Sequence, residues 1–232
     1  MKLKTICMNY YKDVHTKNLL MDISSSTLDN NLNIDILKYL IGYHKMNTNF
    51  KDKNGDDCLL LAFKNNFNIN IIKYLTEFCQ MDINSINNNG DNCLLLACGN
   101  SSDINIIKYL IIDRKMDINY KNNNGNNCLL AACYNNPNIN IIRYLIEECR
   151  VDLNMRNNDG NNCLLLTCKN NLNVDIVKYL IEDCKMDPNI KNNYGNNCLL
   201  ESHSNPNIDI IKYLIEEHKM DINLKANDIN YL

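Results

Sequence analysis

Cysteine is the residue type in this sequence with the greatest chemical potential, because a cysteine thiolate can attack electrophiles or bind metal ions. The chain has 232 residues and 12 cysteines. The segment NNNGNNCLLAAC, residues 122–133, places Cys128 and Cys133 beside a glycine in a polar stretch. Such a segment is either a metal-binding or reactive loop, or a structural part of the fold.

The spacing of the cysteines favours the structural role. Cys128 and Cys133 are five residues apart, which on a helix separates them by about 140° around the axis. The sequence contains neither C-x-x-C nor another familiar ligand spacing. The four histidines do not recur and share no motif: His15, His44, His203 and His218. We therefore expect no catalytic residue, no cofactor and no metal site, and thiols that pack like small apolar side chains.

Charge and segment composition argue against other classes of protein. The net charge of −3 predicts no general affinity for nucleic acid. Each polar segment has a single glycine and no G-K-[ST] follows it, so no phosphate-binding loop is expected. The first residues, MKLKTICMNYYKD, lack the apolar run of a signal peptide, and no later segment approaches a membrane span. We expect a cytoplasmic protein with reduced thiols and no membrane contact.

A 35-residue repeat organises the chain. Five glycines lie 35 residues apart: Gly55, Gly90, Gly125, Gly160 and Gly195. A cysteine follows three residues after each of them: Cys58, Cys93, Cys128, Cys163 and Cys198. About a fifth of the residues are asparagine, and we interpret this bias toward A/T-rich codons as a property of the genome. Periods of this length indicate stacked repeats that share one continuous core.

Each repeat is predicted to be a turn followed by two short helices. Capping residues are expected before the first helix at Asp57, Asn92, Asn127, Asn162 and Asn197. Caps of the second helix are expected at Asn68, Asp103, Asn138, Asn173 and Asn207. In one second helix Ile141, Tyr144, Leu145 and Cys149 form an apolar stripe. Lysine or arginine precedes glutamate by four residues on the other side, at Lys73/Glu77, Arg143/Glu147, Lys178/Glu182 and Lys212/Glu216.

These residues resemble the ankyrin-repeat family. The pattern NxxGNNCLLLAC…NINIIKYLIE…MDIN is similar to the family's D-x-x-G-x-T-P-L-H-x-A-A, followed by I-V-x-x-L-L and A-D-V-N, over residues 33 to 227. Asn or Asp stands for the threonine, Cys for the proline and Leu for the histidine, and each repeat is two residues longer. The asparagine-rich variant resembles ankyrin-repeat proteins of giant amoeba-infecting viruses of the mimivirus type.

The resemblance implies an all-α ankyrin-repeat solenoid of turn–helix–helix units in one elongated domain. The predicted parts are an N-terminal extension at 1–16, a degenerate capping repeat at 17–48, repeats at 49–83, 84–118, 119–153, 154–188 and 189–222, and a partial turn at 223–232. In the last full repeat Glu201, Ser202 and His203 replace an apolar segment. We expect these polar residues to face water, as a terminal repeat must.

Surface positions that vary between equivalent repeats are the candidates for binding a partner. The resemblance implies that the turns, called fingers, and the concave side of the first helices contact other proteins. Aromatic and arginine side chains are frequent interface anchors. The partner-binding candidates are Phe50, Lys51, Lys53, Lys64, Tyr120, Lys121, Tyr134, Met155, Arg156, Lys169, Lys191 and Tyr194. Alternatively, these lysines are simply solvated and some apolar side chains pack the turns.

The predicted function is that of a non-catalytic, monomeric protein-binding module, acting as a viral protein on host proteins in the host cytosol. An acidic or aromatic-bearing protein segment is the expected ligand. Nucleic acid is disfavoured because acidic turn residues lie beside the lysines at Asp52, Asp56, Asp91 and Asp159. The alternatives are an adaptor in ubiquitin ligation, a virion or structural component, and a divergent relative without a binding role.

Overall fold

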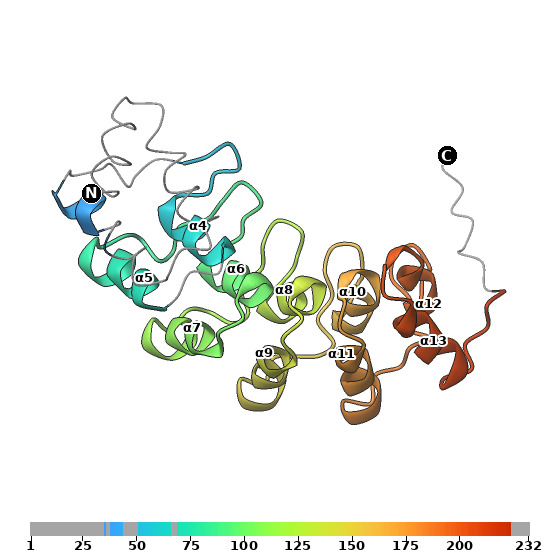
Figure 1. Cartoon of the computed structure of the whole chain (residues 1–232). Helices are drawn as coiled ribbons and strands as arrows, with labels where there is room; N and C mark the ends of the chain where they lie inside the picture. Colours follow the sequence, from blue (N-terminus) through green and yellow to red (C-terminus); the bar gives the residue numbers. More distant parts are fainter. Residues whose placement is uncertain (1–34, 36–37, 44–50, 66–68, 224–232) are drawn as a thin grey trace, which may run out of the picture. The chain divides into compact units, whose positions relative to one another are not determined.

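A computed structural model describes residues 35, 38–43, 51–65 and 69–223 of the chain. The chain forms two compact units, residues 1–93 and 94–232. Regular structure in the described residues is helical, with one isolated antiparallel bridge between Ile86 and Asn92 (Figure 1). The predicted all-α class is confirmed for this part of the chain. The predicted N-terminal extension, most of the capping repeat and Phe50 lie outside the described residues.

The first unit contains one described helix pair and part of another. Its helices are η1 (Lys38–Tyr43), α4 (Cys58–Lys64), α5 (Ile69–Lys73) and η2 (Tyr74–Phe78). The η2 segment continues α5 directly and is wound as a π-helix. Leu59 and Leu60 of α4 and Ile71 and Ile72 of α5 are fully buried, so the inner sides of the two helices form the core.

The second unit repeats this helix pair. The first helices of its repeats are α6 (Cys93–Asn100, which begins at the last residue of the first unit), α8 (Cys128–Asn135), α10 (Cys163–Asn170) and α12 (Cys198–Glu201), which the short 3-10 helix η6 (Ser202–Ser204) follows. The second helices are α7 (Ile104–Lys108) with η3 (Tyr109–Asp113), α9 (Ile139–Arg143) with η4 (Tyr144–Glu148), α11 (Val174–Lys178) with η5 (Tyr179–Asp183), and α13 (Ile208–Glu216). Helix α10 packs against α8 and α12, and α11 packs against α9 and α13. First helices and second helices therefore form two rows (Figure 1).

The predicted helix caps are confirmed at most positions. Side-chain oxygens accept hydrogen bonds from the first turn of the first helices at Asp57, Asn127, Asn162 and Asn197. The same geometry caps the second helices at Asp103, Asn138, Asn173 and Asn207. Each cap satisfies an N–H group that the helix itself leaves without a partner. Asn68 lies outside the described residues.

Each second helix ends with a non-glycine residue in the left-handed region. After η4, for example, the Cys149 N–H donates to the Tyr144 carbonyl at 3.0 Å, and the Val151 N–H donates to the Leu145 carbonyl at 3.0 Å. Arg150 between them has a φ of 54°. Glycine usually occupies this position because a Cβ atom makes the left-handed conformation costly. The same strain recurs at Gln80, Lys115, Lys185 and Lys219.

The repeated glycine is required by the turn and by the finger that follows it. Gly160 has a φ of 79°, and a Cβ atom there would lie 2.8 Å from the backbone nitrogen of Asn193 in the next finger. That nitrogen instead donates a hydrogen bond of 2.9 Å to the Asp159 carbonyl. Fingers of adjacent repeats are thus joined backbone to backbone, and only glycine permits the close approach.

Asparagine side chains join adjacent repeats of the second unit. Asn136, Asn171 and Asn205 directly follow the first helices of their repeats and are buried. The Asn171 amide donates to the carbonyls of Cys133 and Asn136 at 3.1 and 2.8 Å, and the Asn205 amide donates to those of Cys168 and Asn171 at 2.9 Å each. Buried carbonyls need such partners. Much of the asparagine content therefore has a structural role.

Tyrosines of the second helices form a second set of contacts between repeats. The Tyr179 hydroxyl donates to Glu147 at 2.8 Å, and the Arg143 guanidinium lies 4.1 Å from the centre of the Tyr179 ring. The predicted pair of Arg143 with Glu147 forms, at 3.2 Å. In the last repeat, however, Lys212 pairs with Asp209 at 3.3 Å rather than with Glu216 as predicted.

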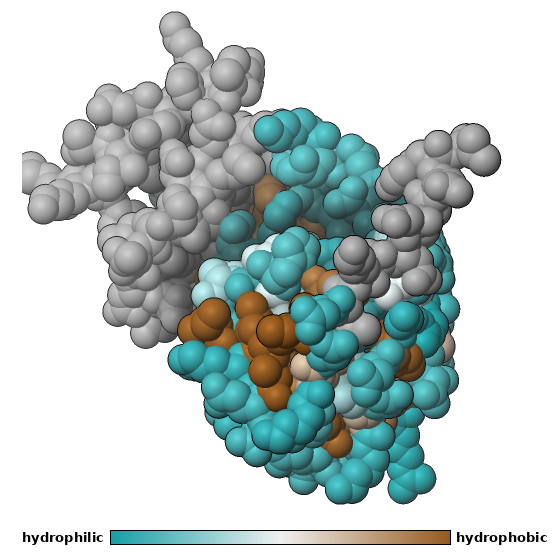
Figure 2. All heavy atoms as spheres, turned by 90° about the vertical axis from the view of Figure 1, so that its right-hand side faces the viewer, coloured by the Kyte–Doolittle hydropathy of each residue, from teal (hydrophilic) through white to brown (hydrophobic). Residues whose placement is uncertain are grey.

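The last repeat does not have the predicted water-facing polar cap. Glu201 is 4% exposed and Ser202 is fully buried, so the prediction is wrong for both, and only His203 is exposed. Glu201 is buried because it turns toward the finger of its own repeat, where it accepts hydrogen bonds from Asn192 and Asn196 at 2.7 and 2.9 Å. Hydrophobic side chains instead gather on the outer end of this repeat (Figure 2).

Candidate functional site

The cysteines are structural in the described part of the chain. Eleven described cysteines are free thiols, and eight of them are buried. The last cysteine of a first helix meets the first cysteine of the next repeat, as Cys98 does with Cys128 and Cys133 with Cys163. These contacts join cysteines 30 residues apart in adjacent repeats, and the separation of Cys128 and Cys133 within one repeat does not predict them.

Burial makes these thiols poor nucleophiles. Burial, followed by the neighbouring Cys128 thiol, raises the pKa of Cys98 well above its ordinary value. Burial and then the Cys163 thiol do the same to the pKa of Cys133. A raised pKa lowers the fraction of thiolate, which is the reactive form. No group of three or more His, Cys, Asp or Glu side chains among the described residues is arranged to hold a metal ion.

The candidate residues of the first unit have different surroundings. Lys64 pairs with the buried carboxylate of Asp56 at 2.8 Å, and the Lys51 ammonium donates to the Ile86 carbonyl at 3.1 Å. Both lysines therefore support the finger turns of their own unit. Lys53 is exposed and has no ion pair with the described residues. Phe50 cannot be placed, because it lies outside the described residues.

The finger candidates of the second unit are together called the finger surface: Tyr120, Lys121, Met155, Arg156, Lys191 and Tyr194. Arg156 donates to the Lys191 carbonyl at 2.9 Å and also to the Gly160 carbonyl, so it braces two fingers. The Tyr194 hydroxyl donates to Asp159 at 3.0 Å. Lys121 and Lys191 are exposed and have no ion pair within the described ranges, so their charges are available to a partner.

The finger turns are held rigidly by their own side chains. The Asn157 side-chain oxygen accepts the N–H groups of Asp159 and Asn161 at 3.1 and 2.9 Å, and the Gly160 N–H donates to the Asn157 carbonyl. The Asn158 amide reaches the Asn123 carbonyl of the preceding finger at 2.9 Å. A surface that is ordered before binding loses little conformational entropy when a partner docks.

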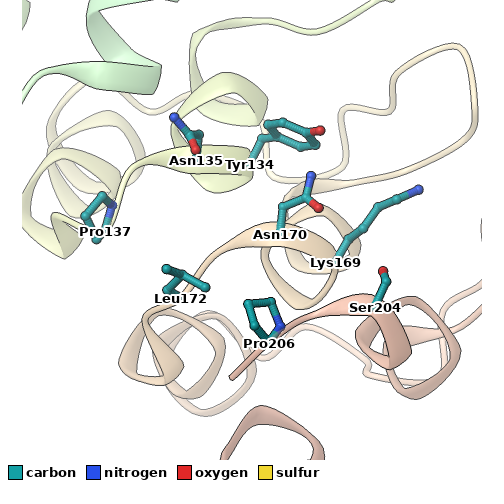
Figure 3. A pocket seen from close by; sticks show the side chains of 8 residues that line it. All are labelled: Tyr134, Asn135, Pro137, Lys169, Asn170, Leu172, Ser204 and Pro206. Atoms are coloured by element: carbon teal, nitrogen blue, oxygen red, sulfur yellow. The ribbon is translucent and has the colours of Figure 1, made fainter. Parts of the chain in front are cut away.

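Two further candidates, Tyr134 and Lys169, lie together in what we call the loop groove. The groove has a volume of about 390 Å³ and is lined by Tyr134, Asn135, Pro137, Lys169, Asn170, Leu172, Ser204 and Pro206. Figure 3 shows these side chains extending from the ends of the first helices and from the loops that follow them, in three successive repeats. Lys169 also pairs with Glu201 at 3.1 Å, so its charge is partly compensated.

The apolar part of the loop groove was not predicted from the sequence. Pro137, Leu172 and Pro206 occupy equivalent positions of three repeats, and all three are exposed, Leu172 by 59%. The signal was present in the sequence, because Ser102 occupies the same position one repeat earlier and three apolar residues replace it in succession. These exposed apolar side chains make the loop groove a candidate for binding an apolar group.

Comparisons with known proteins agree with this architecture. The family described as "Ankyrin repeats (3 copies)" matches residues 20–122, 103–170 and 128–226. The crystal structure of EF0377, an ankyrin repeat protein, has a TM-score of 0.58 and 26% sequence identity, and the match covers 85% of this chain and 96% of that chain. No curated protein matches the sequence.

The chain belongs to the ankyrin-repeat family, and the predicted solenoid fold class is confirmed. Ankyrin repeats generally mediate protein–protein interaction and are typically non-catalytic, so a protein partner is the expected ligand of this chain. Within the described ranges, no helix is both long and apolar enough to cross a bilayer.

Proposed function

We propose that this chain is a non-catalytic binding module that docks an acidic protein segment on the finger surface and seats an apolar side chain of the same partner in the loop groove. The proposal rests mainly on Lys121 and Lys191, two exposed cations without an ion pair in the described part of the chain. Half-buried Tyr120 directly precedes Lys121, and half-buried Ile190 directly precedes Lys191. A cation next to an apolar side chain favours a partner segment in which an acidic residue follows or precedes an apolar residue.

The candidate residues divide into two roles under this proposal. Lys121 and Lys191 contact the partner directly, because nothing in the described structure occupies their ammonium groups. Arg156 acts by positioning, because it donates to the carbonyls of Gly160 and Lys191 and so fixes the spacing of two fingers. Lys169 is held by Glu201 and contributes mainly its aliphatic stem to the loop groove.

The asparagine-rich repeats, which resemble those of giant amoeba-infecting viruses, support a viral origin for the chain. We accordingly propose that the partner is a host protein and that the two meet in the host cytosol. Docking requires no covalent chemistry, which agrees with thiols that burial keeps protonated. The activity is equilibrium binding to a preformed surface.

Lysine footprinting tests the placement of the partner. The chain is acetylated alone and in complex with a purified partner, and modification at each lysine is measured by mass spectrometry. We expect the partner to protect Lys121 and Lys191, while Lys115 and Lys185, which follow second helices, are modified equally in both states. Equal modification of all four lysines in the complex would remove the finger surface as the binding site.

A further inference from the structure

The tips of three finger turns carry asparagine directly before glycine, at Asn54, Asn89 and Asn124. In an Asn-Gly sequence the glycine nitrogen can attack the carbonyl carbon of the asparagine side chain, because glycine has no Cβ atom to obstruct the approach. All three asparagines are exposed. Asp159 and Tyr194 occupy the same position in the two repeats that follow. The finger tips are therefore candidate sites of a chemical modification that is separate from partner binding.

The surroundings of Asn54 and Asn124 differ in one charge. The Asn54 side-chain amide donates to the Asp52 carboxylate at 3.3 Å. Asn124 has no side-chain hydrogen bond in the described part of the chain, and the neutral Asn122 takes the place of Asp52 in its turn. Asp52 and Asn122 hold their turns in the same way, since the side-chain oxygen of each accepts two backbone N–H groups. The two turns therefore have matching hydrogen bonds and a different charge beside the asparagine.

A negative charge beside the reacting amide opposes the attack. The glycine nitrogen must lose its proton, and negative charge develops on the side-chain oxygen of the asparagine as the new bond forms. At Asn54 this charge develops next to the Asp52 carboxylate, and two like charges about 4 Å apart in water slow such a step about fivefold. Asn124 has a neutral amide at the equivalent place. Asn124 should therefore react faster than Asn54, although both precede glycine.

Asn89 is intermediate between these two sites. Its turn begins with the neutral Asn87, but the Asn87 amide donates to the Asp91 carboxylate at 3.4 Å. A negative charge therefore stays near the reacting group, and the expected rate lies between those of Asn54 and Asn124.

We propose that Asn124 is a site of spontaneous deamidation in the folded chain. The Gly125 nitrogen bonds to Cγ of Asn124 and gives up its proton to water, and the side-chain nitrogen leaves as ammonia, so that a cyclic imide forms. Water then opens the imide. Cleavage of the new bond between Cγ and the Gly125 nitrogen gives aspartate, whereas cleavage of the original peptide bond gives isoaspartate, in which the chain continues through Cβ and Cγ. The net reaction consumes water and releases ammonia, and it needs no oxidant or reductant.

Local opening of the finger turn controls the access of the glycine nitrogen. The Gly125 N–H donates to the Asn122 carbonyl at 2.9 Å, so this hydrogen bond must open before the nitrogen can attack. Exposed turns open locally at a small cost in free energy. The Gly55 N–H donates to the Asp52 carbonyl at 3.0 Å in the same way, so opening slows both sites and does not change their order.

The two products affect the fold differently. Asp159 has the position of Asn124 in the next finger, and its carbonyl accepts the Asn193 N–H at 2.9 Å, so aspartate is compatible with the turn. The Asn124 carbonyl accepts the Asn158 N–H at 3.0 Å. In isoaspartate this carbonyl becomes a free carboxylate and the backbone gains one atom, although a Cβ atom on Gly125 would already lie 3.0 Å from the Asn158 nitrogen. Isoaspartate should therefore separate the two fingers that this hydrogen bond joins.

Incubation of the folded full chain at neutral pH, followed by peptide mass spectrometry that separates aspartate from isoaspartate, tests the proposal. We expect both products at Asn124, formed at least about threefold faster than at Asn54. Asn124→Gln should abolish this signal, because the longer side chain closes a ring much more slowly. Asp52→Asn should raise the rate at Asn54 to that at Asn124, and the reverse exchange, Asn122→Asp, should lower the rate at Asn124.

Urea denaturation measures the effect of each product on the fold. The purified isoaspartate form should unfold at a lower urea concentration than Asn124→Asp, which should match the wild type. The proposal is overturned if Asn124 stays unmodified in the folded chain while the urea-unfolded chain converts it, because the turn then protects the site. It is also overturned if Asn54 and Asn124 convert at equal rates, or if Asp52→Asn and Asn122→Asp leave both rates unchanged. An isoaspartate form as stable as Asn124→Asp would contradict the separation of the fingers.

Discussion

The side-chain amide of Asn171 donates a hydrogen bond of 2.8 Å to the backbone carbonyl of Asn136, the equivalent residue of the preceding repeat. Asn136 in turn donates to the Ser101 carbonyl at 2.7 Å, and Asn205 donates to the Asn171 carbonyl at 2.9 Å. One buried asparagine per repeat therefore links the helix pairs of the second unit in series. Because these bonds satisfy carbonyls that water cannot reach, we expect them to contribute substantially to stability.

Replacing Asn171 by alanine should destabilise the chain strongly. Asn171→Ala leaves the carbonyls of Cys133 and Asn136 buried without the amide that they accept. The loss should lower the free energy of unfolding by about 2–4 kcal/mol, measured by urea denaturation. Asn124→Ala, in an exposed finger tip, is the control and should change stability by less than about 0.5 kcal/mol. Equal effects of the two substitutions would refute a special role for the buried asparagines.

Glu201 should make stability depend on pH in the acidic range. Burial by itself raises the pKa of Glu201, but hydrogen bonds from Asn196 and Lys169 outweigh it, so the net pKa lies below its ordinary value. A carboxylate with a lowered folded-state pKa stabilises the fold above its unfolded-state pKa of about 4.3. This contribution is lost as the pH falls through the folded-state pKa.

The test of this dependence is Glu201→Gln, compared with the wild type by thermal unfolding at several pH values. The variant should be less stable by about 1–3 kcal/mol at pH 7, and the difference should shrink as the pH falls below about 4. Glu148→Gln, at an exposed position of η4, serves as the control and should behave like the wild type. A difference that stays constant down to acidic pH would contradict the role of the ionised carboxylate.

Substituting Arg150 by glycine should stabilise the chain. Arg150 has a φ of 54°, which costs a residue with a Cβ atom about 1–2 kcal/mol. Glycine removes this strain, but it also has more conformational freedom than arginine in the unfolded chain. That freedom lowers the stabilisation by about 0.4–1 kcal/mol. Arg150→Gly should therefore raise the free energy of unfolding by about 0.5–1 kcal/mol. Arg150→Ala keeps the Cβ atom and should give no such gain; if it stabilises equally, the backbone strain is not the cause.

Thiol reactivity should follow burial. Cys149 and Cys184 are half-buried, whereas Cys98 and Cys133 are fully buried with pKa values well above their ordinary value. Alkylation of native protein at neutral pH, followed by mass spectrometry, should label Cys149 and Cys184 first and the buried pair only after unfolding. Rapid native labelling of Cys98 would contradict this order.

Stability should also fall as the pH rises above about 8.5, because the unfolded thiols ionise first.

The helix pairs were predictable from the sequence because their signals are local. Asn127 and Asn138 each precede an apolar segment by one residue, which predicts a helix cap. Both residues cap the helices that follow. The buried stripe containing Ile141, Tyr144 and Leu145 follows from a period of 3.6 residues. Such features depend on neighbours along the chain, so a single sequence contains them.

The partners of polar side chains could not be predicted, because they lie one repeat away in space. Lys169 looks like a free surface cation in the sequence, yet it pairs with Glu201, 32 residues later. Arg156 likewise braces a carbonyl 35 residues away. Finding these contacts requires the distance between stacked repeats, which periodicity alone does not supply. Lys121 and Lys191 therefore remain available charges of the candidate surface, whereas Lys169 and Arg156 have structural roles.

The affinity of a purified partner for charge-reversed variants tests the central claim most directly. Isothermal titration calorimetry compares the wild type with the double variant Lys121→Glu/Lys191→Glu, which leaves the bracing residue Arg156 intact. Lys115→Glu/Lys185→Glu makes the same change of charge on residues that follow second helices. We predict that the finger-surface variant binds at least about tenfold more weakly, a loss of about 1.4 kcal/mol, while the control binds like the wild type. An unchanged Kd for Lys121→Glu/Lys191→Glu would contradict binding through the finger surface.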